Sequence, residues 1–245
     1  AKQYYEQSKR YKNVFDPETK WMRGKNKDGK FQSPFNPLKW SDAFTEGNSL
    51  HYTWSVFQDF HGLVQLMGGK EAFEKKIDEV FEMPPLFDDS YYGFTIHEIR
   101  EMQLVGMGNY AHGNQPIQHL IYLYHYAGKP EKVQTKLREV MDKLYSPTPD
   151  GYCGDEDNVQ TSAWYVFSAL GFYPVTPASD NYVLGTPLFK TVTLQLPEGK
   201  KFLIKNVSRN ANSPLVEYVQ LNGRQVEGFE IPFAIFRENG TLTFF

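Results

Sequence analysis

The sequence predicts a mainly α-helical fold that ends in a β-rich part. As far as residue 180, apolar residues recur at helical spacing, and glycines or prolines separate the periodic segments. From Tyr182 onward, apolar and polar residues alternate, which is typical of half-buried strands. We therefore expect helices in residues 1–180 and short antiparallel strands in residues 181–245.

The predicted helices are amphipathic segments that end at recognisable stop signals. Gly68-Gly69 ends the first of them, Gly128 ends the fourth, and Pro147 with Pro149 follows the fifth. The segments are 50–67, 70–82, 95–106, 116–127, 130–144 and 160–171. The strands that follow are predicted from three alternating runs and from the hairpin turn Asn222-Gly223. The runs are 192–196, 202–207 and 216–221.

These helices are too few for a closed helical toroid, so we expect the remaining helices to lie elsewhere. The chain is then the C-terminal part of a larger protein, and its strands pack with a sheet from an absent N-terminal part. A compact helical domain with a β appendage is the alternative. If the 245 residues are alone in solution, we expect little activity and exposed apolar surface.

Composition excludes some classes of function. The net charge is −3 with both signs mixed along the chain, which argues against a nucleic-acid partner and against a charged membrane surface. No apolar run is long enough to span a bilayer, and the N-terminus lacks the apolar stretch of a signal peptide. The single cysteine, Cys153, has no partner for an intrachain disulfide. Aromatic residues make up 16% of the chain, which suits both a core and a carbohydrate cleft.

Acidic side chains cluster where chemistry is expected. Asp155, Glu156 and Asp157 are consecutive, and such mutually repelling groups need a cation or a hydroxyl network to offset the repulsion. With Glu46 far upstream, they indicate a hydrolase that uses two carboxylates. The alternatives are a surface role for Glu46, a helix cap formed by Asp157 or Asn158, and a calcium loop.

Two further groups of polar residues lie at predicted helix starts. His97 and Glu101 share a helix face at i and i+4, and no second histidine completes a zinc pair. His97 and Glu98 suit a hydrogen-bonding wall toward a ligand or a solvated face. Asn114 and Gln115 offer amide oxygens for calcium or sugar hydroxyls, although Asn114 also suits a cap before Pro116.

Taken together, these segments resemble glycoside hydrolase family 92, the calcium-dependent exo-acting α-mannosidases. Five blocks in the same order carry the resemblance, and the fourth is the strongest. They are Glu46-Gly47-Asn48 with Tyr52-Thr53-Trp54, the run 62–69, Gly113-Asn114-Gln115-Pro116 with 122–124, the run 154–174, and the run 182–189.

The resemblance implies an N-terminal β-sandwich followed by an (α/α)6 catalytic domain, of which this chain is the second half. It also implies inversion of configuration, with Glu46 as the general acid and Asp155 and Asp157 as the base pair that activates water. An inverting pair needs carboxyls about 6.5–9.5 Å apart, which separate loops of one toroid face can provide. His97 and Glu98 stand where α-1,2-specific members contact the leaving sugar.

The family's calcium, which binds mannose O2 and O3, is expected at Asn114, Gln115 and Asp155. The substrate is then a mannose-containing glycan, as in N-glycan degradation, and the protein is periplasmic or secreted. Two residues depart from the family pattern: Gln115 replaces a common Glu, and Val159 replaces a common Gly. Another (α/α)6 glycosidase and a noncatalytic calcium- or carbohydrate-binding fragment are the rival hypotheses.

Overall fold

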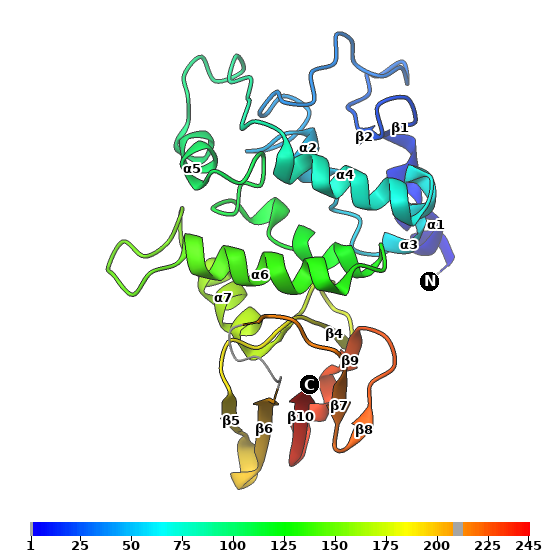
Figure 1. The fold of residues 1–245 in the computed structure, drawn as a ribbon. Helices are drawn as coiled ribbons and strands as arrows, with labels where there is room; N and C mark the ends of the chain where they lie inside the picture. The colour runs from blue at the N-terminus through cyan, green and yellow to red at the C-terminus, as the bar shows by residue number, and fades with distance from the viewer. Residues whose placement is uncertain (1, 208–212) are drawn as a thin grey trace. The chain divides into compact units, whose positions relative to one another are not determined.

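A computed structural model describes residues 2–207 and 213–245, which form one short N-terminal hairpin and helices, followed by strands (Figure 1). The chain divides into two compact units. The first unit comprises Ala1–Leu120, Tyr126–Gly128 and Tyr152–Asp155, and the second comprises Ile121–His125, Lys129–Gly151 and Glu156–Phe245. None of the helices in the described ranges has the length and apolar character needed to cross a membrane.

The first unit contains five α-helices and one short hairpin. The helices are α1 (Lys2–Ser8), α2 (Ser49–Tyr52), α3 (Phe60–Met67), α4 (Lys70–Glu82) and α5 (His97–Val105). The 3-10 turns η1 (Arg10–Asn13) and η2 (Gln115–Ile117) belong to the same unit, as does the hairpin of β1 (Phe15–Asp16) and β2 (Trp21–Met22).

Helix α4 coincides with the predicted segment 70–82 because its apolar residues form one buried stripe. Phe73, Ile77 and Val80 are fully buried at helical spacing. Gly68 and Gly69 both have positive φ (103° and 104°), which lets the chain turn between α3 and α4. The predicted helix 95–106 corresponds to α5, which ends at Gly106.

The single helix predicted over residues 50–67 is wrong. The chain forms α2 and α3 with a loop between them, and Trp54 and Val56 of that loop are buried. A new helix starts because the Asp59 carboxylate accepts a hydrogen bond from the Gly62 N–H (3.1 Å) and caps α3. The buried loop residues had supplied the apolar spacing that predicted one helix.

The second unit contains α6 (Pro130–Leu144), α7 (Gln160–Leu170) and two sheets. The predicted helix 130–144 coincides with α6, and the predicted helix 160–171 corresponds to α7. Residues 116–127 were predicted as one α-helix, which is wrong: they hold η2 and the 3-10 segment η3 (Leu120–His125) instead. Because Leu120 to Tyr124 are all buried, no solvent-facing side gives this segment an amphipathic period.

The larger sheet of the second unit has the strand order β5-β6-β10-β7-β8, and the smaller has β3-β4-β9 (Figure 1). The larger sheet comprises β5 (Thr191–Gln195), β6 (Lys201–Asn206), β7 (Val219–Leu221), β8 (Arg224–Gln225) and β10 (Gly240–Phe244). The smaller sheet comprises β3 (Phe172–Tyr173), β4 (Asn181–Leu184) and β9 (Glu230–Pro232). Two further 3-10 turns are η4 (Pro197–Gly199) and η5 (Phe233–Arg237).

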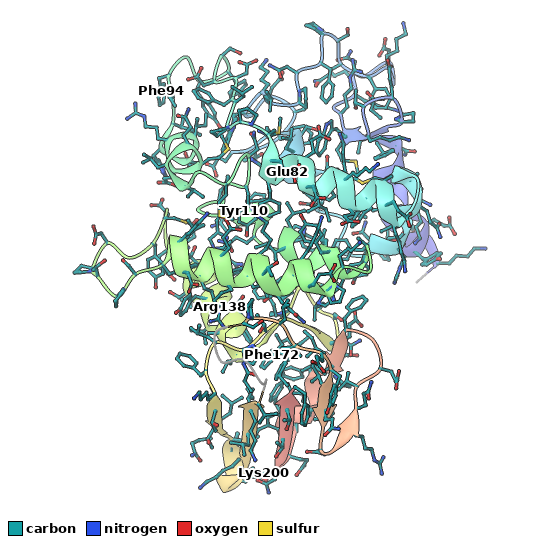
Figure 2. The ribbon with its side chains drawn as sticks, viewed as in Figure 1. Glu82, Phe94, Tyr110, Arg138, Phe172 and Lys200 are labelled. Carbon is teal, nitrogen blue, oxygen red and sulfur yellow. The ribbon has the colours of Figure 1, made fainter. Side chains whose placement is uncertain are left out.

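The strands are short, as predicted, but they are not all antiparallel. The turn Asn222-Gly223 joins β7 and β8, and its two positive φ values (51° and 79°) match a hairpin turn. Strand β10, however, returns between β6 and β7 and runs parallel to β6. Its Leu242 and Phe244 join Phe202 and Ile204 in a fully buried core, and Phe172 lies in the same cluster (Figure 2).

Candidate active site

Glu46 lies in a loop of the first unit that is closed at its base. The Ser41 N–H donates to the carbonyl of Gly47 (2.8 Å), and Lys39 pairs with Asp42 (3.0 Å). Ser41, Asp42 and Glu46 all have positive φ (62°, 66° and 47°), a conformation uncommon for residues other than glycine. The loop leads directly into α2, so Glu46 lies at the rim of a helix as the sequence predicted.

A cavity of about 490 Å³ brings Glu46 together with the two residues predicted to contact substrate, His97 and Glu98. Tyr92 and Phe94 also line it. Phe94 lies in the loop that leads into α5 (Figure 2), and 65% of its surface is exposed. A carboxylate, an imidazole and an aromatic ring therefore line one cavity, and such groups can bind a polar ligand.

His97 is held between two carboxylates of α5. Its Nδ1 lies 3.0 Å from Glu101 Oε1, and its Nε2 lies 3.4 Å from Glu98 Oε1. The hydrogen bond with Glu101 raises the pKa of His97, and the negative charges of Glu98, Glu101 and Asp155 act in the same direction. The pair at i and i+4 was visible in the sequence, and the structure shows that it fixes the ring.

The second carboxylate oxygens of Glu98 and Glu101 are buried and accept no hydrogen bond within the described part of the chain. Burial raises the pKa of Glu101, and the charges of Asp155 and Glu98 add to this, against the lowering effect of His97. Two glycines hold Glu101 closely: a Cβ on Gly154 would lie 2.7 Å from Glu101 Oε2 and 2.7 Å from the Cα of Gly113. Because Gly113 precedes Asn114 and Gly154 precedes Asp155, this packing brings both segments next to Glu101.

Asn114 connects this cluster to the Glu46 loop. It is the residue before η2, and Pro116 lies in the first turn, as predicted. Its side chain forms no cap, however; the amide donates a short hydrogen bond to the backbone carbonyl of Glu46. Gln115 follows at the start of η2.

Asp157 belongs to the second unit, in a tight turn that Glu156 anchors. The Glu156 carboxylate accepts hydrogen bonds from the Val159 N–H (2.8 Å), the Ser162 N–H (3.3 Å) and the Ser162 hydroxyl (2.5 Å). Glu156 therefore caps the start of α7, and the residue at the N-cap position is Val159, whose side chain makes no cap. Asp157 and Asp155 are both left exposed.

Three consecutive residues of this turn have positive φ: Asp157 (54°), Asn158 (53°) and Val159 (78°). For a β-branched residue such as Val159 this conformation is strained. Glycine would avoid the strain at this position. Glycine is also the residue that is common here in the family that the sequence resembles.

Sequence reasoning gave no role to Glu156 or to Phe94. Glu156 was counted only as one of the acidic residues, because nothing in the sequence distinguishes an anchoring carboxylate from an exposed one. Phe94 carried no periodic signal because it lies in a loop. Within the described residues, no group of three or more His, Cys, Asp or Glu side chains forms a metal site, and two of the three proposed calcium ligands are amides.

Comparison with known proteins places these features in one family. A sequence model of the glycosyl hydrolase family 92 catalytic domain matches residues 1–245. A family GH92 inverting mannosidase from Bacteroides thetaiotaomicron VPI-5482 is 48% identical, with a TM-score of 0.85 over 99% of this chain and 33% of that one. A family GH92 α-mannosidase from Bacteroides thetaiotaomicron is 35% identical, with a TM-score of 0.81 over 96% of this chain and 29% of that one.

Among curated proteins, an uncharacterized secreted glycosidase of Arthroderma benhamiae is 25% identical over 191 residues, which are 76% of this chain and 21% of the relative. The chain thus spans a third or less of the length of the relatives it matches. Because the family model covers the whole chain and the first solved structure is 48% identical, this chain belongs to glycosyl hydrolase family 92.

Proposed function

We propose that this chain supplies the acid, the base and the leaving-group site of an exo-acting, inverting α-mannosidase. It would form the second half of an (α/α)6 toroid in residues 1–180, with residues 181–245 packing against an N-terminal β-sandwich of the same protein. The observation that carries the proposal is the cavity in which Glu46 faces His97 and Glu98. The similarity to two bacterial mannosidases supports the choice of sugar.

In this mechanism Glu46 donates its proton to the glycosidic oxygen as the bond from that oxygen to the anomeric carbon breaks. A water molecule attacks the anomeric carbon from the opposite face and loses a proton to Asp157, with Asp155 beside it. Inversion follows because only one displacement occurs, and the water needs carboxyls about 6.5–9.5 Å apart. The hydrogen bond from the Asn114 side-chain amide to the backbone carbonyl of Glu46 holds the acid's loop in position.

The leaving sugar would lie in the cavity against His97 and Glu98. The hydrogen bond with Glu101 orients the His97 ring. Glu98 lines the same cavity, and its carboxylate can accept a hydrogen bond from a sugar hydroxyl. We propose an α-1,2 linkage because these two residues match the positions of α-1,2-specific members.

Calcium would be held by Asn114, Gln115 and Asp155. The donor chemistry of this region fits a hard cation: buried carboxylate oxygens of Glu98 and Glu101 lack hydrogen bonds in the described chain, and backbone glycines bring the segments of Asn114 and Asp155 together. When bound, calcium would bind O2 and O3 of the mannose and favour distortion of its ring.

We also propose that the substrate is a mannose-containing glycan and that the protein works in the periplasm or outside the cell. The secreted glycosidase of Arthroderma benhamiae supports this location.

The test is to measure mannose release from α-1,2-mannobiose by the longest form of this protein that contains residues 1–245, with added calcium and with EDTA. Glu46→Gln should lower kcat on mannobiose by about 10²–10⁴-fold, and by less on p-nitrophenyl mannoside, whose leaving group needs little protonation. Glu82→Gln, at an exposed position of α4, is the matched control.

Calcium-dependent release of mannose from mannobiose that Glu46→Gln lowers to this extent supports the proposal. Release of glucose in place of mannose from the corresponding glucosides would indicate another glycosidase. Binding of mannosides without hydrolysis would indicate a noncatalytic fragment.

A further inference from the structure

A second cavity, of about 380 Å³, lies in the first unit and is not used by the proposed reaction. It is formed by the segment from Gly24 to Phe44 together with Asp88. Its lining combines the amides of Asn26 and Asn36 with the aromatic ring of Phe44.

The two cavities have no lining residue in common, but the same two segments of the chain contribute to both. Residues 41–44 line the second cavity, and Glu46 of the same closed loop lines the first. Asp88 lines the second cavity, and Tyr92, four residues later, lines the first. The hydroxyls of Ser41 and Tyr92 form a short hydrogen bond that joins the two segments.

The second cavity is lined by one ammonium group and two carboxylates, and each carboxylate has a partner. Lys39 pairs with Asp42 (3.0 Å), and Asp88 accepts hydrogen bonds from the Asn36 amide (2.9 Å) and from the Ser90 N–H (3.0 Å). No excess positive charge is left for a phosphate or a carboxylate ligand. The lining therefore suits a neutral ligand that carries several hydroxyl groups.

Two features supply the contacts that a sugar ring needs. The Asn26 side chain is exposed and makes no hydrogen bond to any described residue, so its amide is available for hydroxyls. Phe44 is fixed by stacking on Tyr52, with the ring centroids 5.5 Å apart. The C–H groups of a sugar carry slight positive charge and are attracted to the negative face of such a ring.

We propose that this cavity is a distal subsite that binds a neutral sugar residue of the leaving oligosaccharide, beyond the sugar held by His97 and Glu98. The inference rests on the mannosidase function proposed above. The preferred substrate is then a glycan of three or more sugars, because a disaccharide occupies only the site of cleavage and the first cavity.

The experiment compares kcat/KM for α-1,2-mannobiose and for the α-1,2-linked mannotetraose, using the longest polypeptide that carries this chain. The wild-type protein should prefer the tetrasaccharide. Asn26→Ala should lower kcat/KM for the tetrasaccharide by about three- to tenfold, the worth of one hydrogen bond, and leave the disaccharide unchanged. Asn13→Ala, at an exposed asparagine of η1 outside the cavity, is the matched control.

Asn36→Ala is the second variant, and it should reduce the same length preference. Equal kcat/KM for both substrates in the wild-type protein would overturn the subsite and leave the mannosidase function standing. So would an equal loss on both substrates in Asn26→Ala. Failure to release mannose from either substrate would overturn the mannosidase function itself, and the subsite with it.

Discussion

The strained turn before α7 gives a prediction whose sign depends on backbone geometry. Val159 has a φ of 78° and keeps 64% of its surface exposed. Left-handed conformation costs an L-residue about 1–2 kcal/mol, with β-branched residues at the upper end. Replacement by glycine removes this cost.

The substitution also has costs, and the exposure of Val159 keeps them small. The buried third of the Val159 side chain is lost, which lowers the free energy of unfolding by about 0.5 kcal/mol. Glycine also has greater conformational freedom in the unfolded chain, which lowers the free energy of unfolding by about 0.4–1 kcal/mol more. We therefore expect Val159→Gly to raise the free energy of unfolding by about 0.5 kcal/mol.

Val166 is the matched control because it is also an exposed valine, with 54% of its surface accessible, but lies inside α7. Val166→Gly relieves no strain, so it should lower the free energy of unfolding by about 1 kcal/mol. Urea denaturation of both variants and the wild type measures the difference. Equal destabilisation by the two substitutions would refute the argument that the turn stores strain.

Three further predictions concern the site and its support. Phe94→Ala should raise KM for mannobiose about fivefold, since an aromatic contact is worth about 1 kcal/mol. Tyr91 is an exposed aromatic residue outside the cavity lining, so Tyr91→Ala should leave KM unchanged. Equal effects of the two substitutions would exclude Phe94 as a sugar contact. Glu156→Gln should lower kcat about ten- to a hundredfold with little change in KM, because the turn that carries Asp157 loses its anchor, and an unchanged kcat would contradict this role. Asp59→Ala should lower the free energy of unfolding by about 2 kcal/mol at pH 7, because its carboxylate caps α3 and accepts bonds from Lys9 and Tyr11. Although burial raises the pKa of Asp59, these hydrogen bonds lower the pKa below the usual 3.8. The stabilisation by Asp59 is therefore present above pH 3.8 and is lost as the pH falls through the lower pKa of the folded state. Urea denaturation at several pH values should show that the difference in free energy of unfolding between wild type and variant decreases below about pH 4.

Local patterns predicted those parts of the fold that depend on local physics. The α4 and α6 segments were predicted to the residue because each has a buried apolar stripe and an end marked by glycine or proline. The hairpin at Asn222 followed from its turn residues. The prediction for 50–67 failed because the buried loop residues Trp54 and Val56 supplied helix-like spacing, and that for 116–127 failed because Leu120 to Tyr124 are all buried.

The sequence by itself determined the change from helices to strands, several of the helices, the family, and the candidate residues from Glu46 to Asp157. Each of these depends on residue type and spacing, which a linear chain displays directly. Only the tertiary structure decided that Glu46, His97 and Glu98 face one cavity and that β10 runs parallel beside β6. The same holds for the two glycines that hold Glu101 against the segments of Asn114 and Asp155. Such contacts join residues far apart in the sequence, and their formation depends on how the whole unit packs, which no local pattern records.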